Sequence, residues 1–256
     1  MDRWVLILGT LLAVIGGAWG MVSVHRGNRS LWTIVWMVAV FGCQMAFLGI
    51  RGKEHAACPL TDHGEILVFL SWALTLFYLF VGSTYRISLL GVFTAPVVAV
   101  FQSIALIPGM LNPYPQVVTN GNFWHEIHSA TAVLAYGGFG LAAVAAVMFL
   151  VLDRQLKEHH LKSGLFRNLP PVRELLISME RLLQFAGVLL TLGIIAGFLM
   201  PHDHQEYLGH LLAAVAVWAG YALLLAIKLV RGLTGRRLSL SVVIMFILSL
   251  GVFALV

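Results

Sequence analysis

The chain has 256 residues, of which 60% are hydrophobic and only 11% are charged, so its composition excludes an ordinary soluble globular domain. Long apolar runs of about twenty residues recur along it, and such runs favour membrane-spanning helices over the shorter alternating segments of a β-barrel. The formal net charge of +5 comes from basic residues in the connections between these runs, so it does not indicate nucleic-acid binding. We therefore expect an all-α polytopic membrane protein, embedded in the lipid bilayer as a single domain over residues 1–256.

Eight apolar runs predict eight transmembrane helices. They cover roughly residues 4–24, 31–50, 64–83, 87–108, 124–152, 179–200, 207–231 and 238–255. The first run is longer than the apolar part of a signal peptide and lacks a positively charged leader, so we expect it to be retained as a helix. The stretch PPVRELLISMERLLQF, from Pro170, is typical of an amphipathic entry to the sixth helix. Small residues between Ala132 and Gly140 would permit close helix packing.

The basic residues predict which way the helices cross the membrane. Only Arg3, Arg51 and Lys53 fall on the side of the chain termini, and the other thirteen of the sixteen Lys and Arg residues fall on the opposite side. By the positive-inside rule, the richer side is cytoplasmic and both termini face outward. The histidines show the reverse bias, with seven of ten at the outer face: His55, His63, His125, His128, His202, His204 and His210.

The stretch FWHEIH, residues 123–128, lies where the fifth apolar run begins. His125 and His128 are three residues apart and would share a helix face. Such a pair can bind one metal, or one histidine can be an axial haem ligand while the other stays at the rim. His128 is the stronger candidate because ionisable groups inside membrane helices are usually functional. Trp124 suits either the membrane interface or stacking against a porphyrin.

The seventh helix offers a second histidine of the same kind. His210 lies one turn into the run, four residues after Glu206, whose carboxylate could orient it as a ligand. For His55, His202 and His204, an ordinary interfacial position is the simpler expectation. Cys43 and Cys58 form no C-x-x-C pair, and we expect Cys58 to be a free loop thiol without redox chemistry.

Four stretches in order resemble the cytochrome c assembly proteins of the CcsA/CcmC type, most closely their HemX-like branch, over roughly residues 64–240. The stretches are CPLTDHGEILVFLSWALTLFYLFVG, TYRISLLGVFTAPVVAV, FWHEIHSATAVLAYGGFGLAAV and WAGYALLLAIKLVRGLTGRR. The third is similar to the family pattern W-x-x-x-H followed by Ala-Tyr. The fourth is similar to its W-x-x-Y, a later basic residue and a G-x-x-G-R-R turn.

The resemblance implies a haem-handling role, in delivery of haem for cytochrome c assembly or in a HemX-like accessory role. We do not expect a conventional enzyme, because the sequence shows no nucleophile constellation, phosphate loop or paired catalytic carboxylates. It implies a non-covalent b-type haem with His128 as an iron ligand, and a location in a bacterial cytoplasmic membrane. Partners would be other assembly components or a haem-biosynthesis enzyme. The family's tryptophan-rich outer loop is replaced here by MPHDHQEYLGH, and a late outer histidine is missing. The second ligand is therefore expected from this stretch, first His210 and then His204. The haem propionates would need Arg51, Lys53 or neutral donors.

Other functions stay open at this stage. A scaffold or regulator of haem biosynthesis without a haem site would fit the missing loop. A metal or solute transporter could use the outer His, Asp and Glu residues, although no charged residue is predicted deep in a helix. An electron-transfer cytochrome b is weaker, because six of the eight predicted helices have no histidine in their interior.

Overall fold

The computed structural model describes residues 2–26, 32–85, 88–113, 123–157, 172–200 and 205–255. Side chains are described in these ranges except at 82–85, 88, 172, 205–208, 210 and 252–255. Within the described ranges the secondary structure is entirely helical, which confirms the expected all-α class. The eight helices are α1 (Asp2–His25), α2 (Trp32–His55), α3 (His63–Tyr85), α4 (Ser88–Ala105), α5 (Phe123–Lys157), α6 (Val172–Phe198), α7 (Gln205–Arg231) and α8 (Gly235–Leu255).

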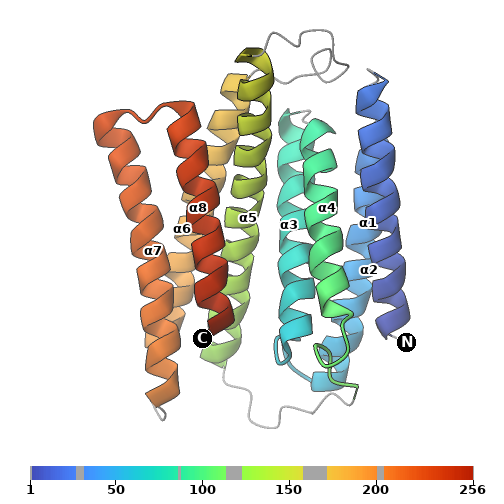
Figure 1. The fold of residues 1–256 in the computed structure, drawn as a ribbon. Coiled ribbons are helices and arrows are strands. Elements are labelled where there is room, and N and C mark those ends of the chain that lie inside the picture. Colours follow the sequence, from blue (N-terminus) through green and yellow to red (C-terminus); the bar gives the residue numbers. More distant parts are fainter. Residues whose placement is uncertain are drawn as a thin grey trace.

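The helices run up and down side by side, and the two chain termini lie at the same end of the bundle (Figure 1). We call this end the outer end and the opposite end the cytoplasmic end, following the charge bias of the sequence. α1 to α4 form one group and α6 to α8 another, with α5 between them (Figure 1). The common side of the termini follows from this arrangement, whereas the single-domain organisation and the assignment of that side to the outside stay predictions.

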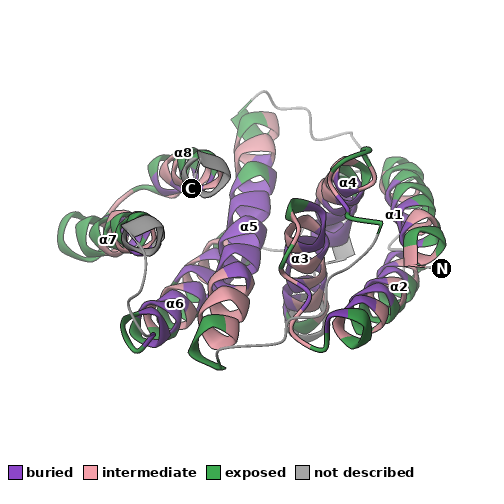
Figure 2. Ribbon diagram, turned by 90° about the horizontal axis from the view of Figure 1, so that it is seen from below, coloured by how far each residue is buried: buried purple, intermediate pink, exposed green. Residues whose placement is uncertain are grey.

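Helix α5 is the axis of the fold, and its middle is buried on all sides (Figure 2). Two adjacent glycines allow this. Gly137 lies directly against Ala73 of α3, and a Cβ at Gly138 would come within 2.9 Å of Ala186 on α6. The absence of side chains at these positions lets three helix backbones approach closely, so the predicted packing role of the small residues is confirmed.

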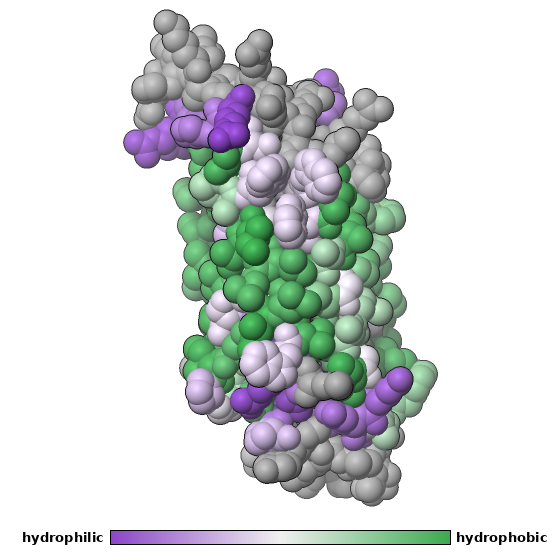
Figure 3. Space-filling model, turned by 90° about the vertical axis from the view of Figure 1, so that its right-hand side faces the viewer, coloured by the Kyte–Doolittle hydropathy of each residue, from purple (hydrophilic) through white to green (hydrophobic). Residues whose placement is uncertain are grey.

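The surface has the character of a membrane protein. Six helices, all except α4 and α8, contain described stretches long and apolar enough to cross a bilayer, and α4 has a shorter apolar segment, Leu89–Ala105. On the face formed by α1 and α2, an apolar band separates two polar ends (Figure 3). Exposed apolar side chains of α1 include Leu8, Leu11 and Ile15. In lipid these side chains need no cover, so the chain is an integral membrane protein.

Three helices, α2, α5 and α6, extend five or more residues beyond the apolar runs that predicted them. α6 begins at Val172, so the amphipathic entry stretch is continuous with the transmembrane helix. α2 continues to His55, five residues past the expected end. The extension of α2 is tolerated because the polar side chains of its last turns, those of Arg51 and His55, are buried against partners rather than placed in lipid.

Candidate functional site

At the outer end, His128 bridges helices α5 and α6. Its side chain is half-buried, and its Nδ1 lies 2.8 Å from the backbone carbonyl oxygen of Gly193. Both residues lie five positions inside their helix ends, roughly 8 Å along the axis. A carbonyl oxygen only accepts hydrogen bonds, so Nδ1 must carry the hydrogen and donate it. In the neutral ring, the lone pair is therefore on Nε2, the arrangement usual for a histidine that ligates a metal through Nε2.

The contact depends on a glycine that sequence reasoning did not single out. A Cβ at Gly193 would lie 2.9 Å from Oγ1 of Thr131 and 3.6 Å from the carbonyl oxygen of His128. α6 therefore approaches α5 closely at the level of the histidine. The Thr131 hydroxyl donates to the carbonyl of Ile127 at 2.6 Å, which holds it within α5. In the sequence, only the small residues of α6 indicate that another helix can pack closely against it. They do not show that this helix is α5.

The other predicted site residues are spread over the outer rim. His125 is exposed and lies one turn from His128, and its part in a site stays a prediction. Trp124 is 38% exposed, and its ring packs edge-on against Phe123 with centroids 5.6 Å apart. His210 lies in the second turn of α7, but its side chain is outside the described part of the structure, and His204 lies outside the described residues. The pairing of either with His128 thus stays a prediction.

A second polar cluster at the outer end is largely buried, and the sequence did not predict it. Arg51 of α2, 1% exposed, lies with its Nε 2.9 Å from a carboxylate oxygen of Asp2 and with Nη1 3.6 Å from Oε1 of Glu65. His55, 2% exposed, places its Nε2 2.8 Å from the same oxygen of Glu65. We refer to Asp2, Arg51, His55 and Glu65 as the outer ion cluster.

The outer ion cluster corrects two expectations. His55 is not an ordinary interfacial histidine, because burial would be costly without its bond to Glu65. Arg51 is not placed to pair with haem propionates, because Asp2 and Glu65 already surround its guanidinium. The cause in both cases is the continuation of α2, which turns these side chains inward against α1 and α3.

The cluster also fastens the loops of the outer end. Glu65 accepts hydrogen bonds from both the backbone N–H (3.1 Å) and the hydroxyl (2.9 Å) of Thr61, just before α3. Arg51 Nη1 donates to the carbonyl of Asn112 at 2.9 Å, and the N–H of Asn112 donates to Asp62 at 2.9 Å. The segments before α3 and after α4 are thus held to the ends of α1 and α2.

Cys58 lies in the loop between α2 and α3 and is half-buried. Burial raises the pKa of its thiol, and the nearby carboxylates of Glu126 and Glu65 raise it further. Because the charge of Glu126 affects the pKa of Cys58, the first turn of α5 lies near this loop. A smaller fraction of the thiol is therefore ionised at neutral pH than in a free cysteine, and the expectation of no redox chemistry at Cys58 stays a prediction.

Comparison with known proteins decides the family. Residues 60–255 match the model of the family described as cytochrome C assembly protein. The chain belongs to this family. Within the family, its placement in the HemX-like branch stays a prediction.

Three relatives in the cytochrome c assembly family are all described as cytochrome c biogenesis protein CcsA. The protein of Guillardia theta is 26% identical over 230 residues, which cover 80% of this chain and 76% of that relative. Those of Crocosphaera subtropica and Nostoc punctiforme are 31% and 32% identical over 133 residues, 49% of this chain. These alignments cover 40% and 38% of the two relatives, so the chain spans well under half of their length.

Several residues that carry the resemblance to the assembly family have structural roles. Trp218 of α7 donates from Nε1 to the hydroxyl of Thr191 on α6 at 2.8 Å. Lys228, the basic residue ten positions later, forms an ion pair with Glu180 of α6. Both contacts fasten α7 to α6, which is also the helix that bonds His128.

Tyr221, the last residue of the W-x-x-Y pattern, joins the core of this family member. Its ring stacks on that of Phe139 in α5, with centroids 3.8 Å apart and planes 1° from parallel. The pattern therefore positions α7 against α5 and α6. Among the described residues, no group of three or more His, Cys, Asp or Glu side chains is arranged to hold a metal ion.

Proposed function

We propose that this protein handles haem in cytochrome c assembly and binds a non-covalent b-type haem at the outer end of α5 and α6, without catalysing a reaction itself. The observation that supports this most directly is the hydrogen bond from His128 to the carbonyl of Gly193. The family described above supplies the biological setting. The membrane would be a bacterial cytoplasmic membrane, and the partners would be other assembly components or a haem-biosynthesis enzyme.

The chemistry of His128 fits the role of an axial ligand. The bond to Gly193 fixes the ring orientation and places the lone pair of the neutral imidazole on Nε2. Haem supplies an iron centre that accepts axial ligands of this kind. The half-buried position excludes part of the solvent, which protects the ligand bond from competition by water. Trp124, one turn earlier on the same helix, adds an apolar surface suited to a porphyrin face.

The remaining contacts of haem would come from the outer rim. His210 is the first candidate for the second ligand, because it lies in the second turn of α7, and His204, which directly precedes α7 in the sequence, is the next. Arg51 is committed to the outer ion cluster, so a propionate would be met by the exposed Lys53 or by neutral donors. A site with so few cations would hold haem loosely enough to release it to a partner.

The test is the absorption spectrum of the full-length protein, purified in detergent from haem-replete cells. We expect a Soret band in the wild type, its loss or strong reduction in His128→Ala, and an unchanged band in His125→Ala. His125 is the matched control because it is a histidine on the same helix, one turn away and exposed. An unchanged band in His128→Ala would exclude it as the ligand. A wild type without any Soret band would overturn haem binding and favour the scaffold or regulator.

The second ligand can be assigned in the same preparation. Replacement of His210 by alanine should convert a low-spin spectrum to a high-spin one if His210 completes the iron coordination. The same conversion in His204→Ala, with no effect of His210→Ala, would assign the second ligand to His204. If neither substitution changes the spin state, the ligand is not in this stretch and that part of the proposal fails.

A further inference from the structure

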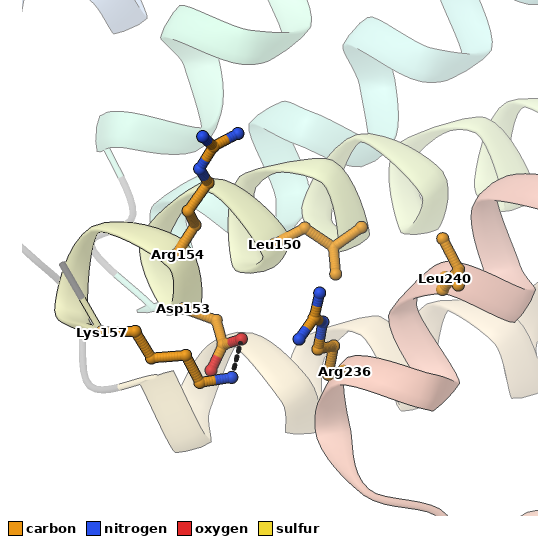
Figure 4. Close-up of a pocket in the computed structure, with 6 residues that line it drawn as sticks. All are labelled: Leu150, Asp153, Arg154, Lys157, Arg236 and Leu240. Atoms are coloured by element: carbon orange, nitrogen blue, oxygen red, sulfur yellow. Dashed lines mark hydrogen bonds and ion pairs between the residues drawn. The ribbon is translucent and has the colours of Figure 1, made fainter.

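At the cytoplasmic end, α5 and α8 enclose a pocket that has no part in the proposed haem site. Its volume is about 410 Å³. Its walls come from the last two turns of α5 and the first turns of α8 (Figure 4). It is lined by Leu150, Asp153, Arg154, Lys157, Arg236 and Leu240. The described lining thus contains three basic side chains and a single carboxylate.

Two of these cations face the space in front of Asp153. Arg236 reaches from α8 toward α5, and Lys157 lies alongside Asp153, whereas Arg154 points to the other side of α5 (Figure 4). The ammonium group of Lys157 donates to Asp153 at 2.7 Å, which uses one of its three N–H groups. In the described part of the chain, Arg236 forms no ion pair. Its planar guanidinium can bind two phosphate oxygens at once.

The rest of the lining is apolar. Leu150 lies two turns before the end of α5, and Leu240, largely exposed, lies one turn further into the bilayer than Arg236. The polar and apolar parts of the pocket are therefore stacked along the membrane normal. A free anion would leave the apolar part unused, whereas a phospholipid would place its phosphate among the cations and its glycerol and first acyl carbons against the leucines.

Asp153 restricts the headgroup further. Its carboxylate would repel a phosphate unless the same molecule offers a hydrogen-bond donor. A hydroxylated headgroup such as that of phosphatidylglycerol provides both a phosphodiester for Arg236 and Lys157 and a hydroxyl for Asp153. The location at the basic end of the bundle corresponds to the leaflet where anionic lipids attract Lys and Arg.

We propose that this pocket binds an anionic phospholipid with a hydroxylated headgroup, of the phosphatidylglycerol class, in the cytoplasmic leaflet. The bound lipid would connect the end of α5 to the start of α8, two helices far apart in the sequence. This inference does not depend on haem binding, because His128 lies at the opposite end of α5.

The test is native mass spectrometry of the full-length protein, released from detergent after addition of phosphatidylglycerol or phosphatidylcholine. We expect the wild type to retain one phosphatidylglycerol with at least tenfold preference over phosphatidylcholine. Arg236→Gln should reduce that preference about tenfold, and Lys157→Gln should reduce it by a smaller factor. Arg237→Gln is the matched control, because Arg237 is the exposed neighbour of Arg236 and does not line the pocket.

Three outcomes would overturn the proposal. The wild type could show no preference between the two lipids. Arg236→Gln and Arg237→Gln could weaken binding equally, which would indicate general attraction to basic residues. Millimolar inorganic phosphate could displace the lipid completely, which would assign the pocket to a free anion. Circular dichroism melting curves of each variant ensure that the comparison is made between folded proteins.

Discussion

The Nδ1 atom of His128 and the backbone carbonyl oxygen of Gly193 lie 2.8 Å apart, across the contact between α5 and α6. The two residues are 65 positions apart in the chain. The contact joins a histidine, which can bind haem iron, to a glycine, which has no side chain. The orientation of the imidazole is therefore a property of the helix pair, and changes in α6 should alter the haem site without touching its ligand.

The first prediction concerns Gly193. In Gly193→Ala, the new methyl group would collide with Thr131 and push α6 away from His128. We expect a loss of about 1–3 kcal/mol in unfolding free energy, together with weaker haem retention during purification. Gly187→Ala on the same helix is the control, since a Cβ there meets nothing within 4 Å. Thermal unfolding in detergent and the ratio of Soret to protein absorbance measure the two effects. Equal behaviour of both variants would contradict the role given to Gly193.

The second prediction concerns the outer ion cluster. Glu65→Gln keeps the shape of the side chain but leaves Arg51 and His55 without their shared buried carboxylate. Removal of one partner from a buried ion pair typically costs about 3–5 kcal/mol. Glu54→Gln, at an exposed position in the last turn of α2, should leave stability unchanged. Unfolding by increasing SDS fraction compares the two variants, and a Glu65→Gln protein as stable as the wild type would show that the cluster contributes little.

The third prediction concerns the packing of α5 against α3. A methyl group at Gly137 would overlap with Ala73, so Gly137→Ala should destabilise the protein by about 1–3 kcal/mol. Gly42→Ala on α2, where a Cβ meets no atom within 4 Å, should be neutral. The temperature at which detergent-solubilised protein aggregates measures both. A neutral effect at Gly137 would mean that the two helices can separate without cost.

The fourth prediction concerns the pH dependence of Cys58. Burial and the carboxylates of Glu126 and Glu65 raise the pKa of its thiol, so the thiolate fraction at pH 8 is below that of a free cysteine. In a Cys43→Ala background, alkylation by iodoacetamide should be slow at pH 8 and accelerate as the pH rises above 9, the ordinary thiol pKa. Glu126→Gln removes one of the negative charges and should speed the reaction at pH 8. Fast alkylation at pH 7 would contradict a raised pKa of the Cys58 thiol. No effect of Glu126→Gln would contradict the contribution of the Glu126 carboxylate to it.

The fifth prediction tests the orientation in the membrane. In a background without native cysteines, a cysteine in Lys53→Cys should react with a membrane-impermeant maleimide on intact cells. A cysteine in Lys157→Cys, where the native side chain is 58% exposed, should react only after permeabilisation. The reverse pattern would invert the sidedness and place His128 on the cytoplasmic side.

The amino-acid sequence by itself determined the helix class, the eight helices and their up-and-down order, because hydrophobicity over about twenty residues is a local property of the chain. It also distinguished His128 from His125, since their places relative to the start of an apolar run can be counted. Helix ends were less predictable. α2 extended past its apolar run because Arg51 and His55 found buried partners, which an apolar pattern does not encode.

Only the tertiary structure decided what surrounds each of these side chains. Three contacts join residues from different helices. His128 bonds to Gly193, Arg51 is buried with Glu65, and Arg236 meets Lys157 at one pocket. In a bilayer, hydrophobicity does not select which helix faces lie together, because lipid tails are as apolar as the helices. That selection depends on shape, through the glycines that admit a neighbouring backbone, and on the pairing of the few polar groups that lipid cannot solvate.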